Sequence, residues 1–211
     1  MTSSCIWVFI KDYISSTINL MPNISKKLRK LKSYELIYIG LIVSIALLIL
    51  CIIMNPVGLR ANDGLSFFGG KGWTIIPYSL AFAFYALCMW LASDRINSTN
   101  STAAYLKTML RIMSLLLVGL TITPHTIVDP IHTTFGTTLF IFQLISSGWL
   151  VYKNGKNLVV YLLILTMLIS GIFSAYYLPL KLGYLLQTQI IYQIAFAGIL
   201  IIYLKNINKE K

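Results

Sequence analysis

The sequence predicts an all-α membrane protein: a six-transmembrane-helix antiparallel bundle, preceded by a short amphipathic helix that lies in the membrane interface. Two observations carry this prediction. The chain of 211 residues is 57% hydrophobic and only 11% charged, whereas soluble domains carry about 25% charged residues. The apolar residues also gather into six long runs, and the polar segments between them hold nearly all the charges. Lipid must surround a chain that has too few polar groups to cover its surface in water.

The net charge of +11 favours contact with a membrane surface rather than with nucleic acid. Lysine and arginine fall between the apolar runs, which is typical of basic loops on the inner face of a membrane. No stretch of interleaved aromatic and basic residues indicates base recognition. The cysteines Cys5, Cys51 and Cys88 are isolated, so they predict neither a disulfide framework nor a CxxC site. We therefore expect membrane lipids, and no nucleic acid, as partners.

The first predicted region, residues 1–35, is an amphipathic and basic cytoplasmic segment. Residues 1–22 mix an apolar cluster with Lys11, Asp12 and several serines, a pattern too polar for a membrane span. Because the basic start of a signal peptide is missing, either an interfacial helix or a mobile tail is expected there. A basic cluster follows: Lys26, Lys27, Arg29, Lys30 and Lys32.

The second predicted region, residues 36–204, is a six-span helical membrane domain, and residues 205–211 form a basic cytoplasmic tail. A span needs about 20 apolar residues to cross roughly 30 Å of hydrocarbon. The predicted spans are 36–54, 75–92, 109–122, 131–151, 158–178 and 185–204. Asn55-Pro56 ends the first span, because proline disfavours helix in the residue before it. The third run is short, so Tyr105, Leu106 and the stems of Lys107 and Arg111 are expected to lengthen it.

Lysine and arginine also predict how the spans are oriented. With the N-terminus inside, all but three of the 17 lysines and arginines fall on the inner side. The three exceptions are Arg60, Lys71 and Lys181. Because the bias of these residue types sets orientation, we expect an integral multi-pass protein with both termini in the cytoplasm. Short connections make consecutive spans antiparallel neighbours.

Two outer connections carry the polar residues from which any chemistry is expected. The first, residues 55–73, brings Asn62, Asp63 and Ser66, the candidate substrate-binding residues. The other, residues 123–132, holds both histidines of the chain. A charge beside hydrocarbon is costly and is usually paired or functional. The candidate catalytic residues in this second connection are His125, Asp129 and His132.

Several chemical interpretations of these side chains stay open. Histidines and a carboxylate suit a divalent metal such as Zn²⁺. The metal-ligand candidates are His125, Asp129, His132 and Asp63. A bound metal would activate water toward an ester or amide of a lipid headgroup. Without a metal, a histidine–aspartate pair would act as a general base. In the structural alternative, Asp129 before Pro130 is a helix N-cap and the histidines are interfacial residues at helix ends.

The two outer connections resemble those of a six-span group of membrane proteins. This group includes DRAM-like and Sfk-type proteins, GPI-lipid-remodelling factors and uncharacterised prokaryotic relatives. The first connection matches through Asn55-Pro56-Val57-Gly58 and through the Ser66-Phe67-Phe68-Gly69 segment after Asn62-Asp63-Gly64. The second matches through Pro124, Asp129, His132 and Gly136, whereas His125 has no counterpart. The resemblance covers residues 36–204 in topology and implies cytoplasmic termini and lipid handling, without specifying a reaction.

Three functions follow as hypotheses. The first is a lipid-handling membrane protein with an outward-facing polar site that binds or modifies a headgroup. The second is a non-catalytic membrane scaffold or regulator that acts through packing and its basic inner face. The third is a small-solute transporter with a polar cavity near Gln143, Gln189 and Gln193. No ionisable residue lies at a predicted bilayer centre, which weakens proton-coupled transport. Whether the protein is an enzyme stays open at this stage.

Overall fold

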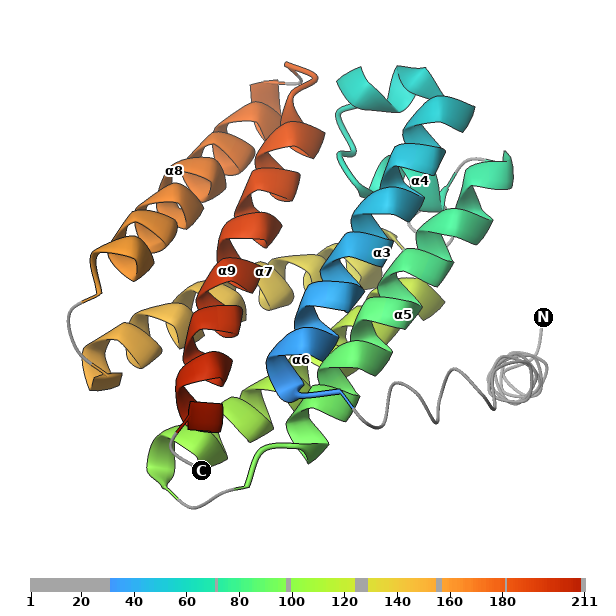
Figure 1. Ribbon diagram of the computed structural model, residues 1–211. Helices are drawn as coiled ribbons and strands as arrows, with labels where there is room; N and C mark the ends of the chain where they lie inside the picture. Colours follow the sequence, from blue (N-terminus) through green and yellow to red (C-terminus); the bar gives the residue numbers. More distant parts are fainter. Residues whose placement is uncertain are drawn as a thin grey trace, which may run out of the picture. The chain divides into compact units, whose positions relative to one another are not determined.

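The fold is a set of helices joined by short connections (Figure 1). The structure is a computed structural model that describes residues 31–70, 72–97, 100–123, 129–154, 157–180 and 182–209. The long helices are α3 (Ser33–Met54), α5 (Ile75–Asp94), α6 (Ser101–Ile122), α7 (Asp129–Asn154), α8 (Leu158–Leu180) and α9 (Leu185–Lys209). The α3–α5 connection holds the short helix α4 (Ser66–Gly69) and two 3-10 turns, η1 (Pro56–Arg60) and η2 (Gly72–Thr74). No strand occurs among the described residues, which confirms the all-α prediction.

Among the described residues, six helices are long and apolar enough to cross a membrane, as predicted. The stretches that meet this criterion are Ser33–Met54, Gly72–Asp94, Ser101–Ile122, Asp129–Lys153, Leu158–Tyr177 and Leu185–Ile207. Their lengths of 20 to 25 residues match the roughly 30 Å hydrocarbon layer. These helices agree with an integral multi-pass membrane protein. The predicted interfacial helix at residues 1–22 lies outside the described residues.

The start of the third span is the largest difference from the predicted boundaries. The sequence predicted a polar segment up to Thr108, but α6 begins at Ser101. The Asn100 side chain caps this helix by accepting a hydrogen bond from the Ala103 N–H at 2.7 Å. An asparagine at this position satisfies one of the free N–H groups of the first turn. The polar residues of this stretch therefore form the first turns of a membrane helix.

The described helices belong to one unit, residues 32–211, and pack mainly on their neighbours in sequence. Helix α3 packs on α5, α5 on α6, and α8 on α9, while α3 also contacts α9. Glycine permits close approach where α6 meets α7: a Cβ on Gly119 would lie 2.7 Å from the Phe135 ring. Helix α8 is the least covered span, since Leu158, Leu162 and Ile172 are more than half exposed. In a membrane, lipid covers such residues without cost.

The α3–α5 connection, the α8–α9 connection and the facing ends of α6 and α7 lie together at one end of this unit. The α3–α5 connection contacts the α8–α9 connection, where the Gly183 N–H donates to Asn62 Oδ1 at 3.2 Å. It also meets the first turn of α7 through Ser66 and His132. We call this the site end, formed by described residues within 55–74, 119–123, 129–133 and 174–189. The basic end is formed by residues 32–35, 90–97, 100–111 and 205.

Candidate functional site

The central contact of the site end joins Ser66 of α4 to His132 of α7. The Ser66 Oγ lies 2.8 Å from His132 Nε2, although the residues are 66 positions apart in sequence. The His132 side chain is only 3% exposed, whereas Ser66 is half-buried. A buried imidazole therefore touches the hydroxyl of a half-buried serine.

A main-chain carbonyl sets the orientation of the imidazole. His132 Nδ1 lies 2.6 Å from the carbonyl oxygen of Thr123, at the end of α6. The last carbonyls of a helix lack helical partners, so this oxygen is available to the ring. Because a carbonyl can only accept, Nδ1 carries a proton and donates it. In the neutral imidazole, Nε2 is then an acceptor, and the Ser66 hydroxyl donates to it.

The Ser66 turn is held between buried apolar residues. Leu65 on one side and Phe68 on the other belong to a buried cluster with Cys51, Tyr78 and Leu186. The packing of these side chains against one another holds the turn against the helices.

Polar contacts to α9 hold the same turn from a second side. The Leu65 N–H donates to Gln189 Oε1 at 2.8 Å. Gly64 has φ of 57°, and a Cβ there would lie 2.4 Å from that same oxygen. Only glycine combines this backbone conformation with so close an approach. The Gln187 Nε2 donates to the Leu59 carbonyl at 2.8 Å, so two glutamines of α9 bind the loop.

Tyr78 on α5 completes the surroundings of Ser66. Its hydroxyl lies within hydrogen-bonding reach of the Ser66 side chain. Gly69 makes room for the tyrosine, because a Cβ there would lie 2.6 Å from its ring. Ser66 thus sits between the Tyr78 hydroxyl and the His132 imidazole.

The structure brings together two of the residues predicted from sequence, Ser66 and His132. Asp129 begins α7 on the surface, and its Oδ1 accepts a hydrogen bond from Thr133 Oγ1 at 3.1 Å. In the first connection, Asn62 binds the α8–α9 connection and the Asp63 side chain is exposed. His125 lies outside the described residues.

The proposed metal ligands do not gather in the described part of the chain. Among those residues, no three or more histidine, cysteine or acidic side chains are placed to share a metal ion. Asp63, Asp129 and His132 therefore form no three-ligand set. A structural or catalytic zinc site needs at least three protein ligands, which these three side chains do not supply.

Two further contributors to the site, Tyr78 and Thr123, were not predicted from the sequence. Tyr78 was interpreted only as an aromatic anchor at the interface, and Thr123 was not singled out. Thr123 contributes its main-chain carbonyl, which no residue type reveals. For Tyr78, the signal available was its place near the start of a span that follows the polar connection.

The glutamines predicted to line a transport cavity are engaged in hydrogen bonds instead. Gln143 on α7 and Gln193 on α9 each donate to the carbonyl oxygen of the other at 3.1 Å. Gln189 accepts from the Leu65 N–H. Their amides therefore join helices and the Ser66 turn, which is the common role of polar side chains within membrane proteins.

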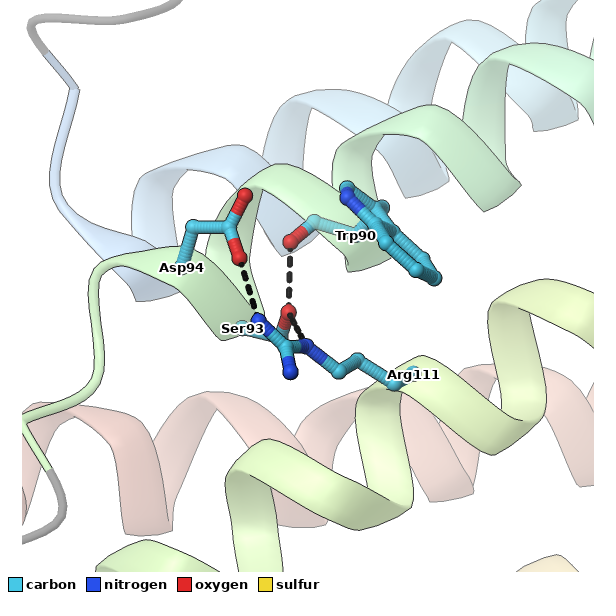
Figure 2. Close-up of polar contacts among 4 residues, drawn as sticks. All are labelled: Trp90, Ser93, Asp94 and Arg111. Atoms are coloured by element: carbon cyan, nitrogen blue, oxygen red, sulfur yellow. Dashed lines mark hydrogen bonds and ion pairs between the residues drawn. The ribbon is translucent and has the colours of Figure 1, made fainter.

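The basic end holds a second polar cluster, at the contact of α5 and α6 (Figure 2). An Arg111 Nη2 lies 2.9 Å from Asp94 Oδ1, and its Nε donates to Ser93 Oγ at 3.4 Å. The guanidinium carbon lies 5.5 Å from the centre of the Trp90 ring. Both charged side chains are 44% exposed, so this ion pair is solvated and contributes less than about 1 kcal/mol.

The chain was compared with protein-family models, with characterised proteins and with solved structures, and none of them matches it. The site is therefore interpreted from its own geometry, and the resemblance to the six-span lipid-handling group stays a prediction.

Proposed function

We propose that this protein is a membrane-embedded enzyme that cleaves or transfers an ester-linked group of a lipid, with Ser66 as nucleophile and His132 as general base. The observation that carries the proposal is the chain of contacts from Ser66 Oγ through the His132 ring to the Thr123 carbonyl. A nucleophile within reach of a base, with the base oriented by a third group, is the arrangement that activates serine.

The proposed reaction begins with attack of Ser66 Oγ on the carbonyl carbon of an ester. The hydroxyl proton moves to His132 Nε2, while the Thr123 carbonyl keeps Nδ1 protonated and the ring in place. The leaving alcohol takes the proton from Nε2 as the ester bond breaks, and an acyl-Ser66 remains. Water or a second alcohol then attacks the acyl carbon and gives its proton to His132 Nε2. As the bond between the acyl carbon and Ser66 Oγ breaks, Nε2 returns the proton to Oγ, which restores the serine and releases the acid or the new ester. The Tyr78 hydroxyl lies beside the reacting oxygen.

The position of the pair supports a lipid as substrate. Ser66 lies in the connection between two apolar helices, and His132 lies in the first turn of another. Ester groups of membrane lipids lie at this level, between headgroup and hydrocarbon. A half-buried serine near the ends of the spans is therefore at the depth where such an ester group would bind.

We further propose the orientation predicted from charge, an antiparallel bundle with both termini in the cytoplasm and the site end outside. The composition of the site end supports this orientation, because two connections and the facing ends of α6 and α7 lie together there. Alternating spans bring every second connection to the same side of the membrane. Described cations at the basic end include Lys32, Arg95, Lys107, Arg111 and Lys205, whereas Arg60 lies at the site end. Cations favour the cytoplasmic side.

Covalent labelling tests the proposed function. The full chain, reconstituted in phosphatidylcholine vesicles, is treated with an alkyl fluorophosphonate, which phosphonylates activated serines. Peptide mass spectrometry should find the label on Ser66. Ser66→Ala should remove the label and any release of fatty acid from the vesicle lipids.

Ser174→Ala is the matched control. Ser174 is also half-buried near the site end, but its hydroxyl donates to Thr188 Oγ1 at 2.7 Å instead of to a histidine. This variant should be labelled like the original protein. If Ser66 stays unlabelled in folded protein, the Ser66–His132 contact is a structural link between connections and the enzymatic proposal fails.

A further inference from the structure

A small apolar cavity lies between α3, α5 and α9, below the turn that carries Ser66. Its volume is about 50 Å³. Its lining includes Leu48 of α3, Phe82 of α5, Ile194 of α9 and Leu65 of the turn. A cavity lined by hydrocarbon offers water no partners, so it suits an apolar group.

The cavity surface is almost entirely apolar, although Ser44, Tyr85 and Gln193 are among its lining residues. The Ser44 hydroxyl donates to the Ala81 carbonyl at 2.8 Å, and the Gln193 amide pairs with Gln143. The Tyr85 hydroxyl is the exception, since it is buried and has no hydrogen-bond partner among the described residues. The wall selects an apolar occupant, because a polar group placed there would lose its hydrogen bonds to water.

The cavity is partly open to the outside of the helix bundle. Ile194 lines it and is 45% exposed on a helix long enough to span the membrane. The material outside this opening is the hydrocarbon of the bilayer, so an acyl chain is the occupant that meets it.

Two contacts connect the cavity with the proposed nucleophile. Leu65, which lines the cavity, directly precedes Ser66 in the chain. Phe82, which also lines it, packs on the Tyr78 ring with centroids 4.7 Å apart, and the Tyr78 hydroxyl reaches Ser66.

We propose that this cavity holds a short segment of the acyl chain of the lipid ester that Ser66 attacks. The rest of the chain lies along the α3–α9 contact in the bilayer. This inference rests on the proposed function and makes it more specific: the substrate is a long-chain acyl ester, recognised through its hydrocarbon as well as its ester group.

Two probes that share the reacting phosphorus test the acyl cavity. The reconstituted protein is treated with ethyl fluorophosphonate and, in parallel, with hexadecyl fluorophosphonate, and the rate of Ser66 labelling is measured. The original protein should react faster with the long-chain probe. Ile194→Trp, which blocks the opening, should slow the long-chain probe about 10-fold and leave the ethyl probe unchanged, a size of effect that hydrophobic pockets produce.

Ile191→Trp is the matched control, because Ile191 is 47% exposed on the same helix and does not line the cavity. It should leave both rates unchanged. Ala81→Val, which fills the cavity from α5, should reproduce the selective loss. Equal rates for both probes in all variants, or equal slowing of both probes, would overturn the acyl cavity while Ser66 labelling still stands. No labelling of Ser66 by either probe would overturn the proposed function, and the cavity assignment with it.

Discussion

The site end and the basic end of this protein both use polar side chains to join helices, but they do so in different ways. At the basic end, Arg111 and Asp94 form an exposed ion pair between two neighbouring helices. At the site end, Ser66 and His132 join segments 66 positions apart through a buried imidazole. An exposed ion pair tolerates the loss of a partner, whereas a buried polar network does not.

Under the proposed function, this difference separates a contact that holds the fold from one that takes part in chemistry. The Arg111 cluster contains an ion pair at hydrogen-bonding distance, but its contacts need no role beyond joining α5 to α6. The His132 ring has one nitrogen held by a carbonyl and the other facing a hydroxyl. That arrangement leaves a base beside a nucleophile. Substitutions at the two ends should therefore differ in the size of their effects.

Replacing the base should have the largest effect. His132→Ala removes the acceptor for the Ser66 proton, and general base catalysis contributes 10²–10⁴-fold to such steps. We expect Ser66 labelling by a fluorophosphonate to slow by about 10³-fold. The rate is measured by mass spectrometry on protein that elutes as a single species in detergent. Thr133→Ala, a change at the next residue, serves as the control and should retain the original rate.

Two glycines test how tightly the Ser66 turn is held. Gly64 and Gly72 both have positive φ, 57° and 50°, but only at Gly64 would an added Cβ meet neighbouring atoms, whereas Gly72 faces open space. We expect Gly72→Ala to cost about 1 kcal/mol from its backbone conformation alone. Gly64→Ala adds a collision with Gln189 and should cost about 2–3 kcal/mol. Reversible unfolding in mixed micelles measures both values; equal costs would contradict the close approach to α9.

The hydrogen bond from α9 to the turn should have a smaller effect. Gln189→Leu leaves the Leu65 N–H without its acceptor, which costs about 1–2 kcal/mol for a buried donor. The same unfolding assay measures the change. Gln187→Leu, whose amide binds the Leu59 carbonyl nearer the surface, is the comparison and should cost less. A larger loss for Gln187→Leu than for Gln189→Leu would show that the turn is not held as described.

The basic end should respond least. Asp94→Asn removes the charge that pairs with Arg111 but keeps a side-chain oxygen that can accept a hydrogen bond. Because both partners are 44% exposed, we expect a loss of under about 1 kcal/mol in unfolding free energy. Ser66 labelling should be unchanged. A marked loss of labelling in Asp94→Asn would mean that the two ends are coupled and that the contrast between them is wrong.

Most of the fold could be predicted from sequence, because the membrane imposes a length and a composition on each span. The first span ends at Asn55, where proline follows, and α8 begins at Leu158 as expected. The third span was misplaced at its start because serine, threonine and asparagine before Tyr105 looked like a loop. Their role as a capped first turn depends on Asn100, and a cap is hard to separate from a loop by composition alone.

The site could be predicted only in part. Ser66 and His132 were both selected, because each belongs to an outer connection of unusual polar content between apolar spans. Their pairing could not be predicted, since it depends on how two distant connections fold over each other. Asp129 looked equally suited to pair with a histidine, yet its described hydrogen bond goes to Thr133. The Thr123 carbonyl has no sequence signal at all, because every residue has one.

The protonation state of the His132 ring decides whether this side chain can act as a base toward Ser66. The chain has only two histidines, so ¹⁵N-histidine labelling in lipid nanodiscs gives few signals, and His125→Gln assigns them. We expect the His132 ring to be neutral, protonated at Nδ1 and unprotonated at Nε2. The ¹⁵N signal of Nε2 should show the hydrogen bond from Ser66, through a coupling across that bond or a shifted resonance. This feature should disappear in Ser66→Ala. A neutral His132 ring protonated at Nε2 and unprotonated at Nδ1 would contradict the proposed pair. In such a ring Nε2 could not accept the proton of Ser66.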